Sequence, residues 1–186
     1  MKIYKYQSFL ESKTDIDSIC KKYNIENYTI NEDGSIDVDG TVHLDKNLNK
    51  LPLKFRNVSG NFIFLDNELT SLEGCPISVG GYFDCGSNQL TSLEGCPQSI
   101  GGGFYCSDNK LTTLEGVPKE IGGSFYCVNN NLTSLEGAPK EVNGDFYCSY
   151  NKLTTLKGAP KKVNYDFSCS GNNLTTLVGA PKKSRH

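Results

Sequence analysis

Apolar and polar positions repeat with a period of 21 residues through most of this chain. Each unit reads Asn-x-Leu-Thr-Ser/Thr-Leu-x-Gly-x-Pro, and its asparagines stand at Asn67, Asn88, Asn109, Asn130, Asn151 and Asn172. An apolar Ile or Val stands three residues after the proline in five of these units, at positions 79, 100, 121, 142 and 163. A fixed period without insertions predicts a solenoid, in which each coil buries its apolar residues against its neighbours.

The segment before each asparagine predicts a short strand, because two apolar residues alternate with an outward one. In five units these residues are Phe and Cys, and a degenerate first coil reads Val42-His-Leu44. The pattern predicts a mainly β fold of about seven coils, whose parallel strands begin at Val42, Phe62, Phe83, Phe104, Phe125, Phe146 and Phe167. A proline in every unit excludes a regular outer helix, so we expect a concave parallel sheet and an extended convex side.

Residues 1–40 do not repeat and predict a small α+β N-terminal cap. Thr14 could cap a helix from Asp15 to about Tyr23, with Ile16, Ile19, Cys20 and Tyr23 on one face. Residues 28–30 and 36–38 flank Glu32-Asp-Gly34 and predict a hairpin. The expected organisation is a cap (1–40), a solenoid (41–181) and a basic tail (182–186).

The asparagine of each unit has a structural explanation. Where a strand bends away, its backbone groups lose their ladder partners, and a buried amide can satisfy both donors and acceptors. The whole pattern, Phe-x-Cys-x-x-Asn-x-Leu, resembles the leucine-rich repeat core Leu-x-Leu-x-x-Asn-x-Leu over residues 42–181. It is most similar to the short repeats of bacterial effectors and of small proteins of tailed bacteriophages. The resemblance implies a protein-binding module, with a host defence protein as a target that it inhibits.

Composition narrows the function further. The net charge of −2 does not favour nucleic acid or an anionic membrane as a ligand, although residues 151–186 are basic. Neither a signal peptide nor a membrane span is evident, so a cytoplasmic protein is expected. The repeated cysteines lack zinc spacing and read as buried free thiols, so we expect no metal and no cofactor. Two distant histidines and no nucleophile–base pattern argue against an enzyme.

The residue between Phe and Cys points outward from the expected concave sheet, and in three adjacent strands it is tyrosine. Amphipathic rings beside acids are typical of protein-binding surfaces. The predicted partner-binding residues are Tyr82, Asp84, Tyr105, Asp108, Tyr126, Asp145, Tyr147 and Tyr150. The alternative is that these tyrosines only stabilise neighbouring strands.

The last coil predicts a second surface, because nothing in the sequence after it would cover its apolar residues. Val178 stands where earlier coils have Glu or Lys. The predicted end-to-end interface comprises Phe167, Cys169, Leu174, Leu177 and Val178, and implies a homodimer or another partner at this end. The alternative is that the basic tail keeps this edge soluble. A structural or virion-associated module is the alternative function.

Overall fold

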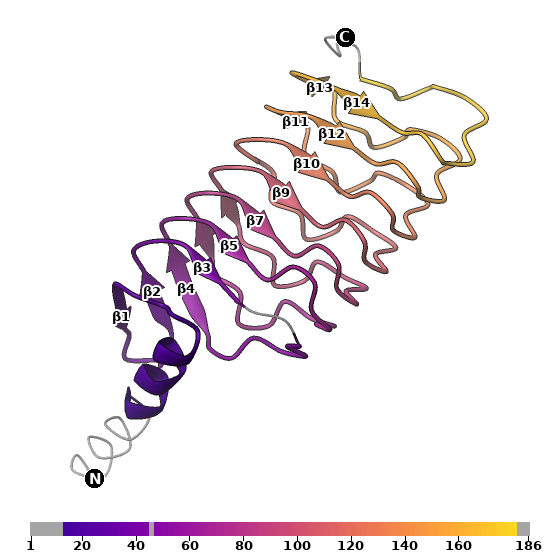
Figure 1. Ribbon diagram of the computed structural model, residues 1–186. Helices are drawn as coiled ribbons and strands as arrows, with labels where there is room; N and C mark the ends of the chain where they lie inside the picture. The colour runs from indigo at the N-terminus through magenta and orange to yellow at the C-terminus, as the bar shows by residue number, and fades with distance from the viewer. Residues whose placement is uncertain (1–12, 45–46, 182–186) are drawn as a thin grey trace.

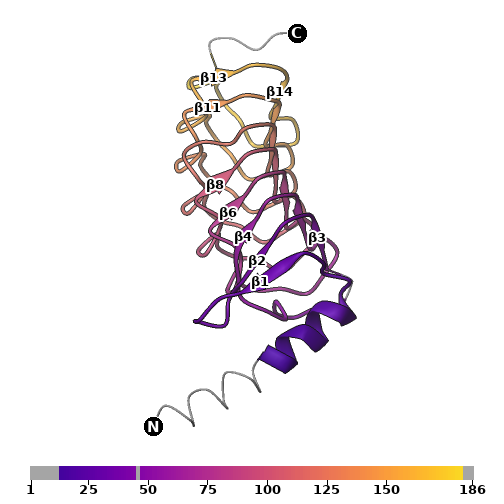
Figure 2. The same cartoon turned by 90° about the vertical axis from the view of Figure 1, so that its left-hand side faces the viewer.

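The computed structural model describes residues 13–44 and 47–181 and shows a mainly β solenoid. The chain winds into one elongated stack with the N-terminal helix below its first coil (Figures 1 and 2). Most coils pass through a strand on one side, a loop and a second short strand on the other side, where Ile121 makes only an isolated bridge to Ile100. The predicted basic tail 182–186 and the first part of the predicted cap lie outside the described residues.

Seven parallel strands form one side of the stack, which we call the front sheet. They run in the order β14-β12-β10-β9-β7-β5-β3. Their bounds are β3 Val42–His43, β5 Phe62–Ile63, β7 Phe83–Asp84, β9 Phe104–Tyr105, β10 Phe125–Tyr126, β12 Phe146–Tyr147 and β14 Phe167–Ser168. All seven begin at the predicted residues, and each phenylalanine from Phe62 onward is paired with the equivalent residue of the next coil.

The opposite side, the back of the stack, also carries strands, which the sequence did not predict. The antiparallel hairpin of β1 (Tyr28–Ile30) and β2 (Ile36–Val38) forms as predicted. It continues in parallel through β4 (Phe55–Val58), β6 (Ser78–Val79) and β8 (Ser99–Ile100). Further along, β11 (Glu141–Val142) pairs with β13 (Lys162–Val163). Val38 thus occupies the same position as Val58 and Val79, so the hairpin is continuous with the solenoid.

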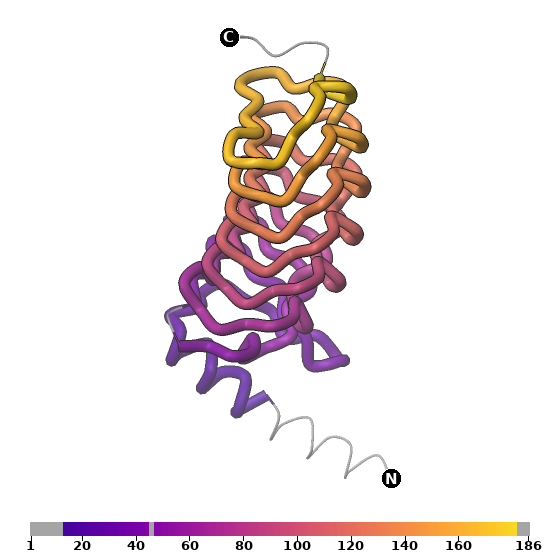
Figure 3. The backbone as a smooth tube through the Cα atoms, turned by 90° about the vertical axis from the view of Figure 1, so that its right-hand side faces the viewer, coloured from indigo at the N-terminus to yellow at the C-terminus, as the bar shows by residue number. Residues whose placement is uncertain are grey.

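Successive coils of the backbone stack on one another (Figure 3). The core is therefore a set of columns, each made by one repeat position. Phe83, Phe104, Phe125 and Phe146 have no exposed surface, and neighbouring rings lie 5.2 to 5.5 Å apart. The leucines of the repeat before the last coil, and the Ile or Val of the back, are almost fully buried, as predicted. The phenylalanine rings are the largest of the fully buried side chains, and they lie beside the small cysteine thiols.

The N-terminal helix differs from the prediction at its start. Residues 13–22 are helical, so Thr14 lies inside the helix and does not begin it; its carbonyl accepts a hydrogen bond from Ser18 Oγ. A threonine is not confined to caps, because its hydroxyl tolerates an exposed helical position. The predicted apolar face is confirmed, since Ile16 and Cys20 are buried and Ile19 and Tyr23 pack against the core.

Candidate functional site

The tyrosines of the front sheet form one continuous row on its outer side. Ring centroids lie 5.7 Å apart from Tyr82 to Tyr105, 5.0 Å from Tyr105 to Tyr126 and 4.7 Å from Tyr126 to Tyr147. The first two pairs are tilted, whereas the last pair is stacked with 7° between the planes. We call the outward side of segments 61–66, 82–87, 103–108, 124–129, 145–150 and 166–171 the tyrosine face.

The row arises from strand pairing. Parallel in-register strands place equivalent side chains about 4.8 Å apart, which is within the range of ring stacking. The four rings are half-buried, so each offers part of its surface to a partner. Sequence analysis placed Tyr105, Tyr126 and Tyr147 in one column. The structure adds Tyr82, which comes from the neighbouring column and reaches the ring of Tyr105.

A glycine makes room for the second ring of the row. A Cβ at Gly103 would lie 2.4 Å from Tyr105 Oη and 2.7 Å from its Cζ. The ring of Tyr105 therefore extends over the position where other coils carry Tyr82 or Ser124. The repeat pattern alone does not reveal this role of Gly103, because it depends on the direction of a neighbouring side chain.

The aspartates of this face are held by hydrogen bonds. Asp145 Oδ2 accepts bonds from Tyr126 Oη at 3.1 Å and from Ser124 Oγ at 3.4 Å, while Oδ1 accepts one from the Asp166 backbone at 3.0 Å. Asp108 accepts a bond of 2.7 Å from the Asn129 amide. Burial raises the pKa of Asp84, whose carboxylate accepts the Gly86 backbone N–H. These contacts fix the positions of the carboxyl groups.

Tyr150 stands apart from the row at the edge of the face. Its side chain is 64% exposed, and its φ of 55° lies in the left-handed region. Other coils fill this position with residues that tolerate such a backbone: Asp66, Ser87, Asp108, Asn129 and Gly171. A bulky aromatic residue is unusual there, and such outliers concentrate at functional sites.

The predicted end-to-end interface is less covered than the equivalent positions of other coils. Leu177 is 69% exposed and Val178 is 75% exposed, although the leucines equivalent to Leu177 are almost fully buried. Phe167, Cys169 and Leu174 are half-buried and pack against the core from one side. Within the described residues, β14 and β13 have no partner strand beyond them.

The cysteine column is buried and reduced, as expected for packing residues. Cys85, Cys106, Cys127 and Cys148 have no exposed surface, and their thiols contact the backbone oxygen of the next coil at 3.4 to 3.5 Å. Burial raises the pKa of all four thiols, for Cys148 to about 12. Such thiols are poor nucleophiles. Sets of three or more His, Cys, Asp or Glu placed to bind a metal were not found in the described part of the chain.

Shallow hollows lie on the back of the solenoid. One of about 420 Å³ is lined by residues 96–99 and 116–120, and one of about 760 Å³ lies beside the hairpin. Ion pairs on the back include Arg56 with Asp37 and Lys157 with Glu136. The helix among the described residues is too short to cross a membrane.

Comparisons of this chain with protein-family models, with curated proteins and with solved structures gave no match. A function for this chain must therefore be inferred from its own geometry. The repeat structure establishes a parallel β-solenoid with a small helical and hairpin cap.

Proposed function

We propose that this chain is a non-enzymatic module that binds another protein through the tyrosine face. The main support for this proposal is the row of four half-buried tyrosine rings, from Tyr82 to Tyr147, that crosses adjacent strands. Tyrosine is enriched at interface hot spots, because a rigid ring buries much area at a low cost in conformational entropy. Strand stabilisation alone would not require the strained and exposed Tyr150 at the edge of the same face.

The proposal includes membership of the leucine-rich repeat class. Its support is the asparagine ladder, in which each buried amide bridges two coils, and the parallel front sheet. The back of this solenoid carries short strands and no helix, and the proline in every coil disfavours a helix there. The similarity to repeat proteins of tailed phages supports a host defence protein as the target, in the cytoplasm of the producing or host cell. This step is an analogy of sequence pattern.

Affinity capture with paired variants tests the proposal. The chain would be used as bait in a lysate of the cells that produce it, beside Y126A/Y147A and the back-side variant E94Q/E115Q. We expect a stoichiometric protein on the wild type and on E94Q/E115Q, with each tyrosine substitution costing about 1–4 kcal/mol of binding free energy. Equal capture by all three baits would place the interface elsewhere. Recovery of the chain in virus particles without a bound protein would favour the structural alternative.

A second candidate is end-to-end assembly through the last coil, and the exposure of Leu177 and Val178 favours it. Val178→Glu restores the acid that earlier coils carry at this position, so it should leave the fold intact. If two copies associate here, light scattering should show a concentration-dependent dimer for the wild type and a monomer for the variant. A wild-type monomer at high concentration would remove this candidate.

A further inference from the structure

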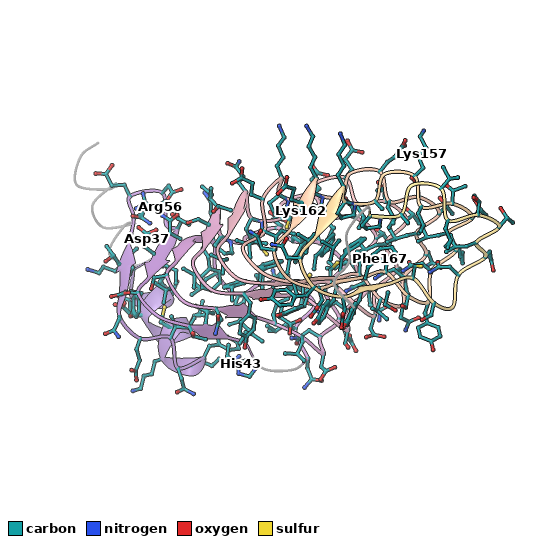
Figure 4. All side chains as sticks on the ribbon, turned by 90° about the horizontal axis from the view of Figure 1, so that it is seen from above. Asp37, His43, Arg56, Lys157, Lys162 and Phe167 are labelled. Carbon is teal, nitrogen blue, oxygen red and sulfur yellow. The ribbon has the colours of Figure 1, made fainter. Side chains whose placement is uncertain are left out.

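Charge is segregated between the two sides of the solenoid. The six segments of the tyrosine face contain Asp66, Asp84, Asp108, Asp145 and Asp166, and no lysine or arginine. All 19 Lys or Arg of the chain lie outside these segments, together with the other 16 of its 21 Asp or Glu (21 − 5). Figure 4 shows Lys157 and Lys162 on the side opposite His43, the first residue of the tyrosine column. A near-neutral protein thus presents one acidic and aromatic surface.

The aromatic row stops at Tyr147, because the equivalent residue of the last coil is Ser168. Tyr126 covers one face of the Tyr147 ring, with nearly parallel planes. The other face is directed towards the last coil, where the equivalent residue is the small Ser168. Tyr126 has a tyrosine ring on both sides, whereas Tyr147 has one on a single side, so its other face has no aromatic neighbour among the described residues.

Polar groups surround this free ring face. Ser149, Ser168 and Ser170 form a hydroxyl chain, with Oγ–Oγ distances of 2.8 Å between Ser149 and Ser168 and 3.1 Å between Ser170 and Ser149. Ser149 is buried, so the chain forms a floor. The carboxylates of Asp145 and Asp166 are close enough to contribute to the raised pKa of Tyr147, after its desolvation.

Tyr150 bounds the other edge of this floor. Its ring packs over the last coil, since a Cβ at Gly171 would lie 2.5 Å from Tyr150 Cδ1. In the sequence, Tyr147 and Tyr150 flank the buried Ser149. The end of the tyrosine face combines a free aromatic surface, hydroxyl acceptors and carboxylates without a cation in the same segments.

We propose that this end of the tyrosine face, between Tyr147 and Tyr150, binds an arginine side chain on the partner protein. A guanidinium group can stack on the free face of Tyr147 while its N–H groups donate to Asp166 and to serine oxygens. Arginine fits better than lysine, because its planar group is weakly hydrated and stacks as well as donates. The inference rests on the proposed protein-binding function and names the chemistry of the partner.

Short fluorescent peptides that alternate glycine with arginine, lysine or glutamate test this chemistry by fluorescence anisotropy. We expect the arginine peptide to bind most tightly, the lysine peptide more weakly and the glutamate peptide not at all. Tyr147→Leu and Asp166→Asn should each weaken arginine-peptide binding by about three- to ten-fold. Glu94→Gln removes the same charge from the back and should leave the affinity unchanged.

Two outcomes would overturn the inference. Equal affinities for the arginine and lysine peptides, unaffected by Tyr147→Leu, would indicate only general attraction between charges. Equal effects of Asp166→Asn and Glu94→Gln would also contradict a local site. Circular dichroism of each variant checks that the solenoid remains folded. Binding of a neutral oligosaccharide in place of the arginine peptide would assign the surface to another ligand class.

The two proposals can fail separately. A captured partner that depends on Tyr126 but not on Asp166 would keep the protein-binding function and remove the arginine site. A peptide that binds as expected, with capture equal for all baits, would keep the arginine site and remove the proposed main interface.

Discussion

At the scale of single residues, the buried asparagines connect the coils. Asn109 Nδ2 donates to the carbonyls of Cys85, Cys106 and Ser107 at 3.0 to 3.3 Å, and its Oδ1 accepts the Leu90 N–H at 2.9 Å. The same pattern recurs at Asn88, Asn130 and Asn151. One side chain thus forms hydrogen bonds with backbone groups of two coils, including the Leu90 N–H.

Asn109→Ala should lower the free energy of unfolding by about 1–3 kcal/mol, because it leaves the buried Leu90 N–H unsatisfied and removes one of the two hydrogen bonds to each of three carbonyls. Urea denaturation measures the loss. Asn131→Ala is the matched control, since Asn131 makes backbone bonds but no side-chain hydrogen bond among the described contacts. Equal losses for the two variants would show that the ladder does not stabilise the fold.

Residue roles were predictable where they depend on the repeat position alone. The ladder asparagines and the inward phenylalanines follow from spacing, and the structure confirms them. The roles of Gly103 and Ser168 were not predicted, because each depends on how a neighbouring side chain bends. The burial of Ser149 likewise depends on its neighbours and does not follow from its position in the repeat.

At the scale of elements, strand pairing on both sides sets the rise of each coil. The front strands were predicted to the residue, since alternation and a fixed period locate them. The back strands span mostly two residues, and two residues give too short an alternation to recognise in a sequence. Their pairing gives the back nearly the same rise as the front.

The cysteine column predicts a pH dependence. Burial raises the pKa of Cys85, Cys106 and Cys127 in the folded state, whereas an unfolded thiol titrates near about 8.5. The folded protein then holds protons that the unfolded chain loses. Stability is fully present below the unfolded pKa and falls as pH rises above it, by up to about 1.4 kcal/mol per pH unit for each thiol.

Urea titrations between about pH 8 and about pH 10 measure this fall. Cys106→Val and Cys127→Val keep apolar side chains of similar size and remove two titrating groups. The double variant should therefore lose stability less steeply with pH than the wild type. The same slope for both proteins would show that the thiols ionise equally in the folded and unfolded chains.

At the scale of the whole molecule, the solenoid is a linear assembly. Its hydrogen bonds join residues about one period apart, as from Phe83 N to Gly103 O and from Phe104 N to Ser124 O. Each coil therefore depends chiefly on its two neighbours, and stability is nearly a sum over coils and interfaces.

Removing residues 109–129 deletes one full period and rejoins equivalent positions, so the shortened chain should fold with an intact far-ultraviolet spectrum. Removing residues 109–128 leaves one extra residue at the junction, between Cys106 and the next ladder asparagine, and disturbs the coils that meet there. We expect this second chain to unfold at a lower urea concentration than the first. Equal unfolding midpoints for the two chains would contradict a core made of aligned columns.

The difference in charge between the two sides of the solenoid becomes visible only in the whole molecule, because the structure is needed to assign each charged residue to a side. Sequence columns gave the tyrosines and most of the aspartates of the face. They could not give the open ring of Tyr147 or the strained backbone of Tyr150, which depend on three-dimensional contacts between coils.

Site-specific photocrosslinking tests directly whether the partner protein binds the tyrosine face. p-Benzoylphenylalanine would replace Tyr126 on the tyrosine face in one protein and Glu115 on the back in another, each with the captured partner present. The account predicts a crosslinked heterodimer from position 126 and none from position 115. Crosslinking from position 115 alone would show that the partner binds the back of the solenoid.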